Sequence, residues 1–459
     1  MTAPLPLPEP PLQAAEPKPA PLLRDSRILY CISALLMFCP LAFGAVEPWA
    51  VFILQASSAI LLAGWILNRL RSQQLSIRWN PLFAPMIAFM ALICIQLVPG
   101  VSAYWHATYS QLLRFVAYGI VCFLIVQTLT RHRQVRKIGR SLTIFGVSLA
   151  IFAVLQNLSS PNKLYWLRTP RFGGWIYGPY VNHNHYAGLM EMLAPMPLVY
   201  AFSRFAHRRD RWIAVSAAAF MAATIFLSGS RGGMIAFSVQ IAIFVIFVLR
   251  DKQRSNVAVL LTAFLLVLIG VTVWTGAREL KARLATLSSD KHSDLSSDVR
   301  WKIDSDVLRM WWQRPALGWG QGTFAEVYPR FRSFYTDLLV NAAHDDFLQV
   351  LAETGIAGFA VTIWFLVTAL RPALRKSRKW QSDLNGALSL SAILAISGIL
   401  VHSFLDFNMQ IPANAVLFYA FCTVAAMEPR FATYSRHRNI PAEFLAAHPV
   451  PTDSELTPI

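Results

Sequence analysis

Charged residues are scarce in this chain of 459 residues, of which 14% are Asp, Glu, Lys or Arg and 55% are hydrophobic. A soluble protein of this length carries far more charge, so the composition excludes an ordinary soluble multidomain protein. The five cysteines all lie in apolar runs and form no Cys-x-x-Cys pair, so neither a zinc site nor a disulfide framework is indicated. A Walker-type glycine loop is also absent, which disfavours a cytosolic nucleotide as substrate.

Long apolar runs make up most of the rest of the chain. Crossing a hydrocarbon core of roughly 30 Å takes about 20 apolar residues, and each such segment must be helical to pair its backbone groups. We therefore predict an all-α polytopic membrane protein with about twelve transmembrane helices and one large, partly helical periplasmic loop. The expected spans are 28–44, 49–67, 81–98, 112–130, 141–158, 186–203, 212–228, 233–250, 256–275, 347–370, 384–405 and 411–427.

Basic clusters predict the orientation of these spans. With twelve spans, the clusters at 24–27, 69–78, 131–140, 204–211, 250–254 and 371–379 all fall on the side of both termini, which the positive-inside rule makes cytoplasmic. The net charge of +17 then reflects orientation and not binding to nucleic acid. We expect a disordered cytoplasmic tail without a cleavable signal peptide (1–27), nine spans with an outer loop at 159–185 (28–275), a periplasmic loop (276–346), three spans (347–427) and a cytoplasmic tail (428–459).

Two arginines stand out on the expected outer face. Arg231 lies in the tight turn Ser228-Gly-Ser-Arg-Gly-Gly233, where flanking glycines allow a ligand to approach the backbone. A guanidinium suits bidentate binding of phosphate oxygens, although a snorkelling arginine at a helix end is the alternative. Arg300 lies in an expected interfacial helix at about 298–313, where a solvated charge beside acidic neighbours is the alternative. The glycines from Gly318 to Gly322 indicate a flexible turn more than a phosphate cradle.

His344 precedes the tenth expected span. A histidine at the mouth of a helix bundle can act as a general base, since its pKa lies near the working pH, or it can cap the helix. The remaining histidines and acids of the outer loops leave a metal site open as a weaker alternative, because no His pair is spaced i,i+4 on one helix. Within the spans, Glu191 is a functional candidate, and we expect His402 and Asp406 to form a structural hydrogen-bonded pair.

Five segments, in this order and spacing, resemble the O-antigen ligase and polymerase superfamily over residues 170–415. They are Asn182-His-Asn-His185, the Ser-Arg-Gly turn at 230–232, Arg300 followed by Arg314-Pro-Ala-Leu-Gly-Trp-Gly-Gln-Gly322, Ala343-His-Asp-Asp-Phe-Leu-Gln-Val-Leu-Ala-Glu-Thr-Gly-Ile-Ala-Gly358, and His402-Ser-Phe-Leu-Asp-Phe-Asn-Met-Gln-Ile-Pro-Ala-Asn414. The N-terminal third is similar only in hydropathy. The fold that the resemblance implies is that of the integral-membrane glycosyltransferases of the C type.

The resemblance also implies an activity and a set of site residues. Such enzymes take a glycan from undecaprenyl diphosphate on the outer face of the bacterial inner membrane and pass it to an acceptor hydroxyl. Arg231 and Arg300 are implied to bind the diphosphate, with Arg309 or Arg314 as alternatives to Arg300, and His344 is implied to position or deprotonate the acceptor. Further expected substrate-binding residues are Asn182, His185, Gly320 and Arg314. Neither a metal nor another cofactor is implied, and direct displacement would invert the anomeric centre.

Other functions share some of these features. Ligase, polymerase and protein O-oligosaccharyltransferase use the same motifs, so the acceptor (lipid A core, another glycan or a protein) stays open. A polysaccharide or lipid transporter is the alternative from another class. A transporter would spread ionisable residues through the membrane depth and show two related halves, whereas the polar residues here gather on one face.

Overall fold

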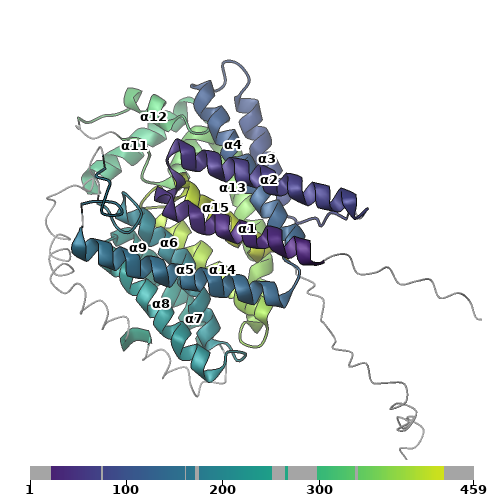
Figure 1. Cartoon of the computed structure of the whole chain (residues 1–459). Helices are drawn as coiled ribbons and strands as arrows, with labels where there is room; N and C mark the ends of the chain where they lie inside the picture. Colours follow the sequence, from purple (N-terminus) through teal and green to yellow (C-terminus); the bar gives the residue numbers. More distant parts are fainter. Residues whose placement is uncertain are drawn as a thin grey trace, which may run out of the picture.

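The computed structural model describes residues 22–73, 76–160, 162–170, 175–250, 264–266, 297–335 and 340–427, which form a bundle of helices (Figure 1). Within these residues there is no sheet, only two isolated bridges, Leu164 with Arg168 and Tyr177 with Tyr180. The predicted all-helical class is therefore confirmed for the described part of the chain.

The helices follow one another through short connections. In chain order they are α1 (Leu22–Leu41), η1 (Phe43–Ala45), α2 (Pro48–Arg71), α3 (Phe83–Gln96), α4 (Trp105–Thr128), α5 (His132–Ser159), α6 (His183–Leu193), α7 (Pro195–Phe202), α8 (Arg208–Ser228), α9 (Arg231–Leu249), α11 (Ser297–Gln313), α12 (Phe324–Val327), η2 (Tyr328–Arg330), α13 (Asp346–Lys376), η3 (Ser377–Lys379), α14 (Leu384–His402), η4 (Asn408–Gln410) and α15 (Pro412–Ala426).

Seven of the described helices are long and apolar enough to cross a membrane: α2, α4, α5, α8, α9, α13 and α14. Two of the other expected spans form shorter apolar helices, α3 and α15. The expected span 28–44 corresponds to α1, which begins earlier, at Leu22. The expected span 256–275 lies outside the described residues except for 264–266. The protein is thus a polytopic membrane protein with fewer long spans among its described residues than the twelve expected from hydropathy.

Two expected spans are interrupted by local backbone chemistry. The span 186–203 divides into α6 and α7 because Pro195 begins a new helix and cannot donate a backbone hydrogen bond. In α13, Gly355 adopts φ 64° and ψ −168°, which breaks the helix near its first third. An apolar run shows neither break, because hydropathy is insensitive to backbone angles.

Helix α14 occupies the middle of the bundle and packs against α6, α7, α9, α13 and α15. Gln240 of α9 crosses this interface, and its amide donates hydrogen bonds to the carbonyl oxygens of Glu191 (2.9 Å) and Leu394 (2.8 Å). Gly398 leaves the space for this amide, since a Cβ there would collide with it. Small residues and buried amides hold helices together in lipid, where the hydrophobic effect does not.

Helices α11 and α12 lie together at one end of the bundle (Figure 1). The segment from Pro315 to Gly322, which follows α11, docks onto the break in α13. The backbone N–H of Gly320 donates to the carbonyl of Glu353 (2.9 Å), and the Glu353 carboxylate accepts from the N–H groups of Gly322 (2.8 Å) and Phe324 (3.1 Å). This docking fixes α11, and with it Arg300, over the bundle.

Candidate functional site

His344 and Asp406 approach each other where α13 begins and α14 has ended. Nδ1 of His344 lies 3.3 Å from Oδ1 of Asp406, and the two side chains are 17% and 1% exposed. The contact is close but not aligned, and Nδ1 has no other partner in the described part of the chain. Catalytic contacts of this kind often tighten only when substrate is bound. His344 also has φ 57°, a left-handed conformation that costs a non-glycine residue about 1–3 kcal/mol.

Three neighbours fix the environment of this pair. The Asn184 amide donates to Oδ2 of Asp406. The ring of Phe407 contacts the rings of both His344 and His185, with centroids 4.8 Å apart in each case. Asn182 does not reach the pair, because its side chain caps α6 by accepting from the N–H of Asn184 (2.8 Å). Asn182 therefore orients the helix that presents Asn184 and His185.

The charge of Asp406 is set by its histidine neighbours. Burial by itself raises the pKa of a carboxyl group, but the interaction with His344 and the charges of His185 and His402 hold the pKa of Asp406 well below its usual range. Asp406 is thus a carboxylate at neutral pH. A carboxylate beside one ring nitrogen favours the proton on that nitrogen and leaves the other nitrogen as the proton acceptor.

Arg300 reaches the same turn from α11. Its guanidinium donates from Nη1 to the carbonyl oxygen of Leu405 (3.0 Å), and its buried Nε has no partner in the described part of the chain. Asp304, one helical turn further on, has its pKa raised to about 6 by burial and by the carboxylate of Asp345, although His344 and Arg300 oppose the rise. Arg300 thus stands close to the histidine site with part of its guanidinium uncommitted.

Arg231 is presented by a rigid turn. Gly229 closes α8 in the left-handed conformation (φ 75°), and the Ser230 hydroxyl caps α9 by accepting from the N–H of Gly233 (3.0 Å). Arg231 is the first residue of α9; its side chain is exposed and has no hydrogen bond or ion pair among the described residues. Gly232 lets the turn sit against α14, where a Cβ would lie 2.7 Å from the His402 ring.

A buried ion pair supports this turn from below. Nδ1 of His402 lies 2.9 Å from Oε1 of Glu191, and both side chains are fully buried. The other ring nitrogen of His402 is 3.4 Å from the Ser230 hydroxyl. The expected pair of His402 with Asp406 is therefore wrong: α14 ends at His402, so the two side chains diverge, and each pairs with a residue from elsewhere in the chain.

Three other expected residues serve the fold. Arg314 donates to the carbonyl of Val101 (2.7 Å), and its guanidinium stacks 4.3 Å from the centre of the Trp319 ring. Arg309 pairs with Asp306. Gly320 has φ 112° and abuts the side chains of Ser102 and Thr108, so the glycine run is a packed turn and not an open cradle. Of the candidate arginines in the loop, only Arg300 reaches the histidine site.

Asp345 and Asp346 connect this site to the bundle. The Asp345 carboxylate caps α13 by accepting from the N–H groups of Phe347 (2.8 Å) and Leu348 (2.9 Å), and burial raises the pKa of this carboxyl group. Asp346 accepts from the Ser403 hydroxyl (2.8 Å) and the Met409 N–H (2.9 Å), and so holds the start of α13 against the turn that carries Asp406.

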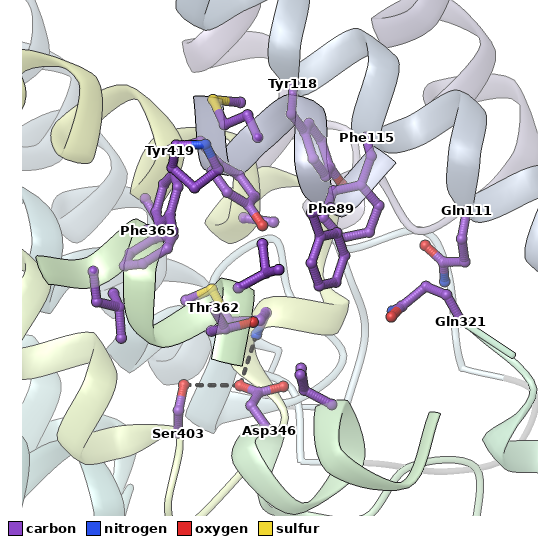
Figure 2. A pocket seen from close by; sticks show the side chains of 18 of the residues that line it. Phe89, Gln111, Phe115, Tyr118, Gln321, Asp346, Thr362, Phe365, Ser403 and Tyr419 are labelled. Carbon is purple, nitrogen blue, oxygen red and sulfur yellow. Dashed lines mark hydrogen bonds between the residues drawn. The ribbon is translucent and has the colours of Figure 1, made fainter. Parts of the chain in front are cut away.

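An apolar cavity of about 110 Å³ opens beside Asp346 (Figure 2). Its walls are mainly aromatic and come from α3, α4, α13 and α15; they include Phe89, Phe115, Tyr118, Phe365 and Tyr419. Gln111 and Gln321 stand at one side of it, and Asp346 and Ser403 stand at another. His344, Arg231 and Arg300 do not line it, so the cavity adjoins the polar site through Asp346 and Ser403 only.

Asp406 and Asn184 are the functional candidates that sequence reasoning missed. Both lie inside segments already singled out, but a spacing of four residues suggested a helical pair for Asp406. The Asp-Phe-Asn-Met-Gln-Ile-Pro sequence after Leu405 indicates the end of a helix and is the signal that could have corrected this. Across the described ranges, no group of three or more His, Cys, Asp or Glu side chains is arranged to hold a metal ion.

These features define an all-helical polytopic membrane protein with arginines, a histidine and a carboxylate gathered at one end of its bundle. Residues 216–363 match the family model described as O-antigen ligase, which confirms the resemblance over α8, α9, α11, α12 and the first half of α13. The match includes Arg231, Arg300 and His344, whereas Asp406 lies beyond it. A search of curated proteins gave no match.

Proposed function

We propose that this protein transfers a glycan from undecaprenyl diphosphate to an acceptor hydroxyl on the outer face of the bacterial inner membrane, as an O-antigen ligase-like glycosyltransferase. The observation that supports this most is the convergence on residues 402–407. Arg300 bonds to Leu405, the Arg231 turn packs on His402, and His344 contacts Asp406. Two cations and a base–carboxylate pair are thereby placed around one short turn.

The proposed reaction is a single displacement. The acceptor oxygen attacks the anomeric carbon as its proton passes to the free ring nitrogen of His344. The bond between that carbon and the diphosphate oxygen breaks, and its electron pair leaves with the diphosphate. Arg231 and Arg300 bind this developing negative charge, which fixed guanidiniums stabilise without moving. Attack opposite the leaving group inverts the anomeric centre.

Each supporting contact has a defined task in this scheme. Asp406 keeps His344 in the tautomer that accepts a proton and stabilises the ring once it is charged. The Glu191–His402 pair holds the Ser230 cap and therefore the direction of Arg231. The aromatic cavity next to Asp346 offers apolar walls for part of the polyprenyl chain, because isoprenoid carbons gain by leaving water or by contacting aromatic rings.

A donor-consumption assay tests this function. Purified protein in detergent is given a labelled glycan on undecaprenyl diphosphate, with and without acceptor, and free undecaprenyl diphosphate is measured. We expect acceptor-dependent release that persists in chelator and yields the inverted linkage. Abolition by chelator would point to metal-dependent chemistry instead. Donor that crosses a vesicle membrane without being cleaved would support the transporter alternative.

The acceptor is tested separately by deleting the gene. Loss of side chains attached to lipid A core supports ligation, whereas single repeats attached to the core support a polymerase. Altered protein glycans or exopolysaccharide with unchanged lipopolysaccharide support the other acceptors. We favour the ligase because the matched family is described as O-antigen ligase.

A further inference from the structure

A second cavity, of about 610 Å³, opens at the far end of the bundle from Arg231 and His344. It lies between the start of α5, the end of α7, the start of α8 and the start of α14. Helix α14 has 19 residues and runs from this cavity to His402. At about 1.5 Å per residue this distance is close to the thickness of a hydrocarbon core, so the cavity lies at the opposite membrane surface.

The walls and rim of this cavity differ in chemistry. The walls are mainly apolar and include Ile144, Met196, Ile213, Ala217 and Leu388. Arginines stand at the rim: Arg136 and Arg140 are one turn apart on the same face of α5, and Arg209 comes from α8. His207 and Asp210 also border it, and Asp210 accepts a long hydrogen bond from Tyr200 (3.4 Å).

The three rim arginines are not used by the fold. Their side chains are exposed, and none forms an ion pair or hydrogen bond within the described part of the chain. An apolar slot of this size is in the range of small-ligand sites. Guanidiniums bind phosphate oxygens bidentately, and basic pockets between transmembrane helices bind anionic lipid head groups.

We propose that this cavity binds one anionic phospholipid, with its phosphate on Arg136, Arg140 and Arg209 and an acyl chain along the apolar wall. A free anion would gain nothing from the wall, and a neutral lipid would leave three guanidiniums unpaired. The site is at the membrane surface opposite the transfer site, so it does not depend on the proposed reaction.

Native mass spectrometry of the detergent-purified full chain tests this inference. Phosphatidylglycerol is compared with phosphatidylcholine of the same acyl chains and with glycerol phosphate as the head group alone. We expect one tightly bound phosphatidylglycerol, and weak binding of the other two. Equal binding of phosphatidylcholine would overturn the proposal, and equal binding of glycerol phosphate would reduce the site to one for a free anion.

Matched variants separate the cavity from general surface charge. Since each basic side chain near an anionic lipid contributes roughly a fivefold effect, the combined variant Arg136→Ala, Arg140→Ala, Arg209→Ala should bind about a hundredfold more weakly. The variant Arg371→Ala, Arg375→Ala, Arg378→Ala removes the same charge from another basic segment and should bind like the parent. Ala217→Trp fills the wall and should also weaken binding. Unfolding temperatures without lipid verify folding, and equal losses in both arginine variants would contradict the inference.

Discussion

His344 depends on Asp406 more than on any other side chain in the proposed site. Asp406→Asn keeps the shape of the carboxylate but removes its charge, so the ring of His344 loses the partner that sets its tautomer. We expect the turnover number to fall by about a hundredfold or more, with little change in donor binding, in the acceptor-dependent release assay. Asn184→Ala, which removes only a donor to Asp406, should cost less. Normal turnover in Asp406→Asn would contradict the assigned role.

Asp304 makes the stability of the site region depend on pH. Its pKa is about 6 in the folded protein against an ordinary value of 3.8, so folding favours the protonated form. Its favourable contribution is complete below about pH 4 and is lost as pH rises through 6. Asp304→Asn should therefore raise the unfolding temperature relative to the parent above pH 6 and not near pH 4. A difference that is the same at all pH values would contradict the assigned titration.

The sequence indicated some of these residues and not others, for a physical reason. Arg231 and His344 stand out because a charged or titratable residue beside an apolar run is costly unless it has a use. Asp406 looks like a partner of His402, since a spacing of four residues places two side chains together only while the helix continues. Where the helix ends depends on contacts with Asp346 and Asn184, which come from distant parts of the chain.

At the scale of elements, the docking of residues 315–322 onto the break in α13 holds α11 in place. Gly318 has φ 68°, and a Cβ there would collide with the backbone of Glu353. We expect Gly318→Ala to destabilise the protein by about 1–3 kcal/mol and to lower activity by displacing Arg300. Thermal unfolding in detergent measures the first effect. Gly139→Ala is the control, since a Cβ there meets nothing within 4 Å.

Hydropathy predicted the long helices well and the interrupted ones poorly. α2, α5, α8 and α14 follow from apolar length alone, because a membrane demands about 20 apolar residues. The separation of α6 from α7 and the break at Gly355 follow from single residues whose backbone preferences an apolar average conceals. The described part of the expected periplasmic loop also packs closely onto α13, which composition could not indicate.

For the whole molecule, the central claim is that Arg231, Arg300 and His344 act together at one end of the bundle. The most direct measurement is glycan transfer by purified Arg231→Lys, Arg300→Lys and His344→Asn, with Arg314→Lys as the matched control. Lysine keeps the charge but loses bidentate binding, and asparagine tolerates the left-handed backbone at His344. We predict that all three variants lose at least about a hundredfold in transfer rate while remaining folded, and that the control retains most of its activity. Full activity in Arg231→Lys and His344→Asn would contradict the account.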